Sequence, residues 1–377
     1  MPSSAPVGLP RLLSCLLVST LSLAAHAHHP VAAKFNTDSA NRIQGQVTAV
    51  DWSNPHVHVF VNVSEADGSV TNWAIELPSR AELEWSGWRP ESLQVGSRVN
   101  AEGWVALNGT HQLWANALTD AGGKAVFQVD ENLEERLLSK RGNEETPRWP
   151  DGQPRLGPPP GETGFWGFPS LSSLVEDGQS IKMDDRGLLD NLNDAANVAP
   201  FQDWALALYR ERQRNKLRDD PMFLYCVPPS GPRQFQQMFG TQFVEERERK
   251  RILALLSGGN GNWRIFYTDD RTQMGQVSGN DDNPLFFGHS KARWEGDTLV
   301  VDNTGFNEGF WFSNGGLPHT KLLKLTERFT RLDKNTLRYS VTVDDAGAYT
   351  RPWTSTWDLQ WVAGEELPEY YCQDNRP

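Results

Sequence analysis

The chain has 377 residues and a formal net charge of −12 at pH 7, and 38% of its residues are hydrophobic. This length is sufficient for two hydrophobic cores. The acidic balance argues against nucleic acid or an anionic membrane as a partner, because both require clustered lysine and arginine. The fifteen tryptophans are unusual. Indole side chains fill β cores, and they also line pockets for apolar or aromatic ligands.

Residues 1–27 have the pattern of a secretory signal peptide. Arg11 precedes an apolar run over residues 12–25, and Ala25 and Ala27 have the spacing that signal peptidase accepts. The run is too short to span a bilayer, and no transmembrane segment is expected later in the chain. We therefore expect a periplasmic or secreted protein whose mature chain begins at His28.

Removal of the signal peptide leaves two cysteines, Cys226 and Cys372. In an oxidising compartment this even number predicts a disulfide. Closing so long a loop is worth about 4–5 kcal/mol in the chain-entropy model. The alternative is a pair of buried thiols.

Residues 28–129 are predicted to form an OB-like β-barrel domain. Apolar residues alternate with period two in five segments, which indicates strands over 43–52, 56–63, 70–77, 98–107 and 112–118. Asp67-Gly68 predicts a hairpin turn, and Ser79 can cap a short helix between the third and fourth strands. Five strands in this order are typical of an OB-type barrel. Acidic residues outnumber basic ones here, so we expect no binding of single-stranded nucleic acid.

Histidines in the first third of the chain suggest a metal site. A terminal His28 would offer a metal both its free amine and its Nδ1. His56 and His58 flank Val57, so on a strand their side chains would point to the same face. Three or four nitrogen donors suit Cu(II) better than a hard cation. One hypothesis is therefore a copper site at His28, His56 and His58, and the alternative is ordinary histidines at a cleavage site and a strand end.

Residues 130–164 are predicted to be a linker, because six prolines between 147 and 160 oppose regular hydrogen-bonded structure. Residues 165–377 form the second predicted domain. One helix is expected over residues 200–216, with an apolar stripe of Phe201, Trp204, Ala205, Leu208 and Tyr209. We interpret it as a packing helix, and a lid over a barrel mouth is the alternative.

The rest of the second domain alternates like a β protein. Strands are predicted over 237–244, 251–256, 263–268, 290–294, 298–304, 322–331, 336–343 and 353–362, with tight turns at 295–297 and 333–335. About eight strands in meander order favour a closed, lipocalin-like antiparallel barrel, since closure removes exposed edges. Such a barrel can hold one small ligand. An immunoglobulin-type sandwich is the alternative fold.

Two functions are considered for this barrel. The first is binding of a small apolar or aromatic ligand by Trp263, Trp294, Trp311 and Trp353. The second is a lyase, isomerase or hydrolase in which His289 or His319 acts with Tyr267 or Glu327 as general acid and base. In the structural alternative, Glu327 forms a solvated ion pair with Arg328, and the histidines mark loops.

Several motifs resemble known exported proteins. Those of the first domain are His28-His29-Pro30, Phe35, Gly45-x-Val47, Trp52-x-Asn54-Pro55-His56, Asn72-Trp73-x-x-Glu76 and Gly103. They resemble the N-terminal domain of a large family of exported Gram-negative bacterial proteins of unknown function. The segment from Trp294 to Asp302 resembles a lipocalin or fatty-acid-binding-protein hairpin, and the second domain as a whole is similar to one found in related exported proteins. The resemblance implies compartment and fold, and it implies no reaction.

Overall fold

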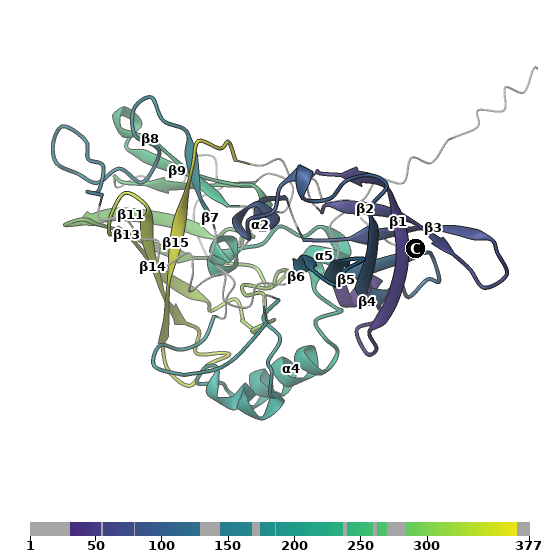
Figure 1. Cartoon of the computed structure of the whole chain (residues 1–377). Coiled ribbons are helices and arrows are strands. Elements are labelled where there is room, and N and C mark those ends of the chain that lie inside the picture. The colour runs from purple at the N-terminus through teal and green to yellow at the C-terminus, as the bar shows by residue number, and fades with distance from the viewer. Residues whose placement is uncertain are drawn as a thin grey trace, which may run out of the picture.

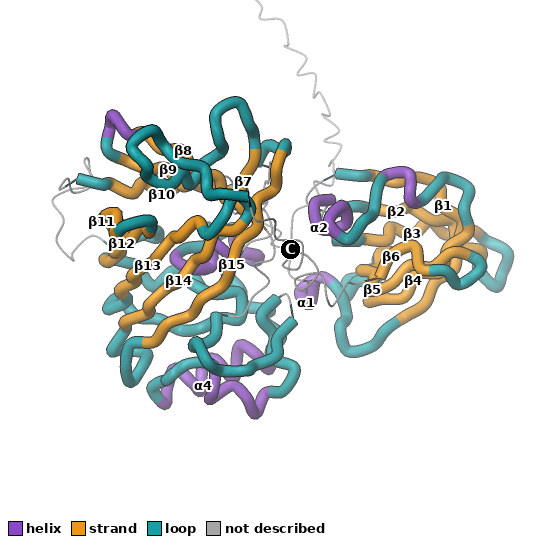
Figure 2. Tube along the Cα trace, turned by 60° about the vertical axis from the view of Figure 1, so that its left-hand side comes forward, coloured by secondary structure: helices purple, strands orange, loops and turns teal. Residues whose placement is uncertain are grey.

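The computed structural model describes residues 31–53, 56–78, 80–128, 144–167, 174–184, 186–236, 240–258, 262–269 and 284–367. These residues form two β-barrels that lie side by side (Figure 1). Figure 2 shows α1 (Val31–Lys34) and α2 (Arg80–Trp85) on the side of the smaller barrel that faces the larger one. The two barrels contact each other where Lys216 donates hydrogen bonds to Thr37 and Asp38.

The smaller barrel has the predicted OB-type order. Its strands are β1 (Asn41–Asp51), β2 (His58–Ser64), β3 (Val70–Glu76), β4 (Arg98–Val105) and β5 (Gln112–Asp120). They pair in the order β3-β2-β1-β4-β5, and a parallel pairing of β3 with β5 closes the barrel. Helix α2 and the short 3-10 helix η1 (Pro90–Ser92) lie between β3 and β4 in the chain. The additional strand β6 (Ala125–Gln128) pairs with β5 and was not predicted.

Alternation along these strands builds the core of the smaller barrel. The inward positions are apolar and almost fully buried, among them Val59, Val61, Ile75 and Leu113. Phe35, directly after α1, is also fully buried, and its ring lies 6.2 Å from that of Trp114. Burial of this phenyl ring fixes α1 against the barrel.

The larger barrel closes with nine strands. They are β7 (Gly164–Gly167), β8 (Thr241–Glu246), β9 (Arg251–Leu256), β10 (Asn262–Tyr267), β11 (His289–Glu295), β12 (Thr298–Thr304), β13 (Lys324–Arg331), β14 (Thr336–Asp344) and β15 (Trp353–Ala363). Their order around the barrel is β10-β11-β12-β13-β14-β15-β7-β8-β9. The predicted closed barrel is therefore confirmed, and the alternative fold, an immunoglobulin-type sandwich, is not found. Eight strands correspond to the predicted ones, and β7 is the additional ninth.

Most helical segments of the second domain are short. The predicted packing helix is α4 (Asp203–Arg214), which lies at one end of the larger barrel (Figure 1). Its Ala205 and Tyr209 are fully buried, whereas Trp204 is half-exposed and donates a hydrogen bond to the carbonyl of Gly347. The other helical segments are η2 (Leu192–Asn197), α5 (Pro221–Tyr225), η3 (Gly231–Phe235) and η4 (Arg247–Arg249). Among the described residues, no helix is both long enough and apolar enough to cross a membrane.

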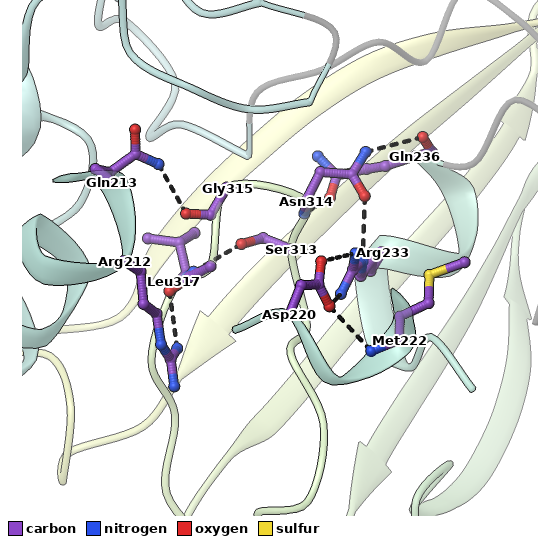
Figure 3. Close-up of polar contacts among 11 residues, drawn as sticks. Arg212, Gln213, Asp220, Met222, Arg233, Gln236, Ser313, Asn314, Gly315 and Leu317 are labelled. Carbon is purple, nitrogen blue, oxygen red and sulfur yellow. Dashed lines mark hydrogen bonds and ion pairs between the residues drawn. The ribbon is translucent and has the colours of Figure 1, made fainter. Parts of the chain in front are cut away.

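The segment η3 is packed against the inner face of the larger barrel. All five of its residues are buried, and the ring of Phe235 lies 5.0 Å from that of Phe329 and 4.7 Å from that of Tyr339. Polar contacts hold the segment in place (Figure 3): Arg233 forms a buried ion pair with Asp220, and its Nε donates to Asn314 at 3.1 Å. The described side chains on this part of the inner face thus pack against one another rather than line an open space.

The described part of the expected linker, residues 144–163, contacts the larger barrel. Leu156 is fully buried, and its carbonyl accepts a hydrogen bond of 2.7 Å from the indole of Trp166. Arg148 forms an exposed ion pair with Asp297 in the β11–β12 turn. This proline-rich segment is therefore attached to the surface of the second domain.

Candidate functional site

Two histidines and one glutamate of the smaller barrel lie together. We call His56, His58, Glu76 and Lys34 the histidine–glutamate cluster. His58 opens β2 and lies opposite Glu76, the last residue of β3. His56 Nδ1 contacts Glu76 Oε1, and His58 Nε2 lies 3.7 Å from Glu76 Oε2. The ammonium group of Lys34, the last residue of α1, lies 2.8 Å from the same Oε2.

The cluster is shielded from water. His56, His58 and Glu76 are 4%, 6% and 2% exposed. The ring of His56 meets that of Trp114 edge-on, with 5.0 Å between the ring centroids. A carboxylate at this depth requires cationic or hydrogen-bonding partners, because loss of hydration is costly for a charge. Lys34 and the two imidazoles provide them.

The hydrogen bonds of the two rings define which nitrogen carries a proton. The Nδ1 of His56 faces a carboxylate oxygen, and the Nδ1 of His58 lies 3.1 Å from the carbonyl oxygen of His56. Both partners are acceptors, so each Nδ1 carries a proton, and the Nε2 of His58 itself lies 3.7 Å from the Glu76 carboxylate. Metal-binding histidines are typically oriented in this way, by a carboxylate or carbonyl on the nitrogen that does not bind the metal.

The sequence anticipated part of this cluster. It predicted that His56 and His58 share a face, and the structure brings both to one carboxylate, although β2 begins only at His58. Glu76 and Lys34 were not among the predicted site residues. The available signal was an acidic residue in the otherwise apolar end of β3, where burial of a charge demands a partner.

His28 lies outside the described residues, three positions before α1 in the sequence. Among the residues that the structure describes, no group of three or more His, Cys, Asp or Glu side chains is arranged to hold a metal ion. The copper site predicted at His28, His56 and His58 therefore stays a prediction.

The larger barrel contains a different polar group, centred on Glu327. Its side chain is fully buried on β13 and forms an ion pair with Arg264 of β10, whose two terminal nitrogens each reach one carboxylate oxygen. Tyr339 donates a hydrogen bond of 2.7 Å to Oε1, and the amide of Asn303 donates to Oε2. The alternative considered for Glu327, a solvated ion pair with Arg328, is wrong. Arg328 points outward from the alternating strand and pairs with Glu295.

This arrangement makes Glu327 a counter-ion rather than a free base. Four donor contacts occupy its two oxygens, and one of them comes from a permanently charged guanidinium. Burial, together with the negative charge of Glu327, raises the pKa of the Tyr339 hydroxyl well above its ordinary value. Two donors of the network, Arg264 Nε and Gln234 Nε2, have no hydrogen-bond partner among the residues that the structure describes.

The other residues considered for catalysis do not join Glu327. None of its hydrogen bonds involves His289, His319 or Tyr267. His289 is half-buried at the start of β11, and Tyr267 is buried at the end of β10. His319 packs between Phe310 and Phe312, with ring centroids 4.4 and 5.6 Å away. Within the described residues, Glu327 is therefore not hydrogen-bonded to either histidine.

The four tryptophans proposed to bind a ligand differ in exposure and in their neighbours. Trp263 is 60% exposed on β10, next to the inward-pointing Arg264. Trp353 is buried against Tyr349, and Trp311 is buried beneath the guanidinium of Arg212, 4.4 Å from the ring centroid. Trp294 on β11 is partly buried against the core.

Only one of the two cysteines of the predicted disulfide lies within the described residues. Cys226 follows α5 in a left-handed backbone conformation with φ of 53°. Cys372 lies outside the described residues. The disulfide between them stays a prediction.

The buried His319 gives an expected pH effect. Burial lowers its pKa below the usual 6.5, although the carbonyl oxygens of Phe310 and Thr320 favour the charged form. As the pH falls through 6.5, the unfolded chain takes up this proton before the folded chain does, so stability is lost on the acid side. We expect His319→Gln to lose less stability than the wild type between about pH 7 and about pH 5.

Urea denaturation at several pH values measures this difference, with His111→Gln, at an exposed position, as the control. If the free energies of unfolding of the wild type and His319→Gln fell in parallel between about pH 7 and about pH 5, the lowered pKa of His319 would be contradicted.

With this geometry in place, comparison with known proteins adds one finding. Residues 16–113 match a family of unknown function, DUF6152. The match includes His56, His58 and Glu76 and ends before the larger barrel. No curated protein matches the chain.

Proposed function

We propose that this protein is exported and binds a transition metal, Cu(II) in the first instance, through His28, His56 and His58. The observation that carries the proposal is the orientation of the two described imidazoles. His56 contacts Glu76 through Nδ1, the Nδ1 of His58 lies 3.1 Å from the carbonyl oxygen of His56, and both rings therefore lie beside one buried carboxylate. Cleavage after Ala27 would give His28 a free amine in addition to its ring.

The donor chemistry favours copper over hard cations. Imidazole and amine nitrogens suit the tetragonal preference of Cu(II), whereas Ca²⁺ and Mg²⁺ take oxygen ligands. The single carboxylate of the cluster is already bound to His56 and Lys34, which fits an orienting role for Glu76.

The test uses protein exported to the periplasm and purified without a tag, with its first residue established by intact mass. Cu(II) titration against a competing chelator measures the affinity. We expect His28→Ala, His56→Ala and His58→Ala each to weaken binding about 100-fold or more, beyond the 10–100-fold typical of an orienting residue. The exposed His111, in the same barrel, provides the control His111→Ala.

A variant with three alanines inserted before His28 separates the amine from the ring and leaves no histidine at the second or third position, where it would form a new Cu(II) chelate with the amine and the backbone amides. It keeps every imidazole but removes the terminal amine chelate, so we expect weaker binding than in the wild type. Micromolar or weaker affinity that is unchanged by His28→Ala would overturn the proposal.

Ligand binding in the larger barrel is the second candidate and has less geometric support. The aromatic rings around Phe235 pack against one another, and of the four tryptophans Trp263 is largely exposed whereas Trp311 and Trp353 are buried. Arg264 Nε and Gln234 Nε2, which have no partner within the described part of the chain, favour a small polar ligand or a water molecule over the apolar molecule expected from composition. We therefore place metal binding first.

A further inference from the structure

We propose that the larger barrel has a site for an extended peptide, and that residues 155–157 of the chain occupy this site as a tethered ligand. We call Trp166, Phe243, Glu245 and Arg331 the peptide groove. Its ligand class is an extended peptide in which an aliphatic residue is followed by glycine and proline. The inference goes beyond the proposed function, because the groove shares no residue with the histidine–glutamate cluster.

A single carboxylate binds the backbone donors of the ligand. Oε2 of Glu245, on β8, accepts hydrogen bonds of 2.9 Å from the amide of Leu156 and of 3.1 Å from the amide of Gly157. Its Oε1 accepts a hydrogen bond of 3.0 Å from the indole of Trp149, in the same proline-rich segment. Hydrogen bonds to an ionised carboxylate are stronger than those between neutral groups. Glu245 therefore holds two consecutive amides of the ligand.

Other side chains of the barrel bind the backbone acceptors of the ligand. Nη1 of Arg331, on β13, donates to the carbonyl oxygen of Arg155 at 2.8 Å and to that of Gly157 at 3.0 Å. The indole of Trp166, on β7, donates to the carbonyl oxygen of Leu156 at 2.7 Å. Within a sheet, a neighbouring strand supplies such partners. Here side chains from three strands supply them, which is how a site can bind a peptide through its main chain.

Contacts within the barrel position the cation of the groove. The guanidinium of Arg331 lies 4.8 Å from the ring centroid of Trp166 and 5.2 Å from that of Trp361, and its Nη2 donates to the carbonyl of Lys334. Burial lowers the pKa of Arg331 to about 10, and the negative charge of Glu245 opposes this shift. Groups that are positioned in advance lose little conformational freedom on binding, which favours affinity.

Two positions of the ligand determine which sequences fit. The side chain of Leu156 is fully buried. A Cβ atom on Gly157 would lie 2.3 Å from the carbonyl oxygen of Phe243, a backbone atom of β8. Pro158 follows, and a residue before proline favours the extended conformation. The groove therefore fits a buried aliphatic side chain followed by glycine.

The experiment measures binding of a synthetic peptide of residues 147–161 to the full mature protein. In a linker variant, a glycine–serine linker of equal length replaces residues 147–157, which removes the tethered ligand and leaves the groove. Fluorescence anisotropy of the labelled peptide should show binding to the linker variant about tenfold or more tighter than to the wild type, because the tethered ligand occupies the groove of the wild type. The peptide should also raise the melting temperature of the linker variant by more than that of the wild type.

Changes to the groove and to the peptide test the recognition. Glu245→Gln in the linker variant should weaken peptide binding about tenfold or more, because an amide oxygen is a weaker acceptor than a carboxylate. Glu246→Gln is the matched control on the same strand, since Glu246 pairs with Arg251, and it should leave binding unchanged. A peptide that carries Gly157→Ala should bind about tenfold or more weakly than the parent peptide, because its Cβ meets the backbone of β8.

Each outcome bears on the groove alone, whatever the result of the Cu(II) titration. If the linker variant does not fold by itself, the peptide added during refolding should restore the folded state, and no restoration would overturn the proposal. A folded linker variant that binds the peptide no better than the wild type would overturn it as well. Equal binding of the parent peptide and the Gly157→Ala peptide would show that the groove does not recognise this segment.

Discussion

Replacement of Glu327 with alanine should lower the free energy of unfolding of the larger barrel by about 3–5 kcal/mol, since it leaves a buried guanidinium without its counter-ion. Arg264 is 3% exposed, and the carboxylate of Glu327 neutralises both of its terminal nitrogens. Tyr339 and Asn303 would lose an acceptor at the same time. Urea denaturation followed by tryptophan fluorescence measures the change.

The controls separate charge from packing. Glu295→Ala removes an exposed carboxylate that pairs with Arg328, and it should cost no more than about 1 kcal/mol. The double variant Glu327→Leu/Arg264→Met removes both charges together and should recover most of the loss, because apolar replacement of a whole buried pair is often tolerated. If Glu327→Ala fails to fold, the double variant still decides. A double variant as unstable as the single one would show that the ion pair is not the cause.

Strand alternation explains why much of the fold could be predicted. Strands β9 and β12 have the predicted bounds, and β3, β14 and β15 each differ from the prediction by one residue at one end. Tight turns marked by Gly68 and Gly296 also occur as expected, with positive φ at both. These signals are local, so they can be recognised without knowledge of the partner strand.

Elements whose structure depends on distant partners could not be recognised. β7 reads Gly-Phe-Trp-Gly and is buried at every position, so it has no alternation. η3 reads Gly-Pro-Arg-Gln-Phe and resembles a surface turn, yet it is buried because Asp220 neutralises Arg233 and aromatic rings from several strands surround Phe235. Only tertiary contacts supply those partners.

The same distinction applies to the candidate sites. His56 and His58 are two positions apart, so period two alone predicts their common face. Glu76 and Lys34 reach them from β3 and α1, and no local pattern links these elements. Likewise, the sequence placed Glu327 beside Arg328, its chain neighbour, whereas its partner Arg264 is 63 residues away. Adjacent side chains of a strand point to opposite faces of the sheet, so two neighbouring charges on a strand do not pair with each other.

The smaller barrel should lose about 3 kcal/mol of stability when Gly103 becomes alanine, the upper range for overpacking. Gly103 lies where the pairing of β4 with β5 shifts register, and a Cβ atom there would lie 1.8 Å from the carbonyl oxygen of Trp114. Because the obstructing atom belongs to the backbone, β5 itself has to move. Thermal unfolding of Gly103→Ala measures the cost.

Gly122→Ala is the matched control, because its Cβ would meet only the flexible carboxylate of Asp120, at 3.3 Å.

The two variants also test how the barrel supports the histidine–glutamate cluster. Displacement of Trp114 removes the edge contact that positions the ring of His56. Gly103→Ala should therefore weaken Cu(II) binding while Gly122→Ala does not. A Gly103→Ala variant as stable as the wild type would show that β4 and β5 do not approach as closely as the register requires.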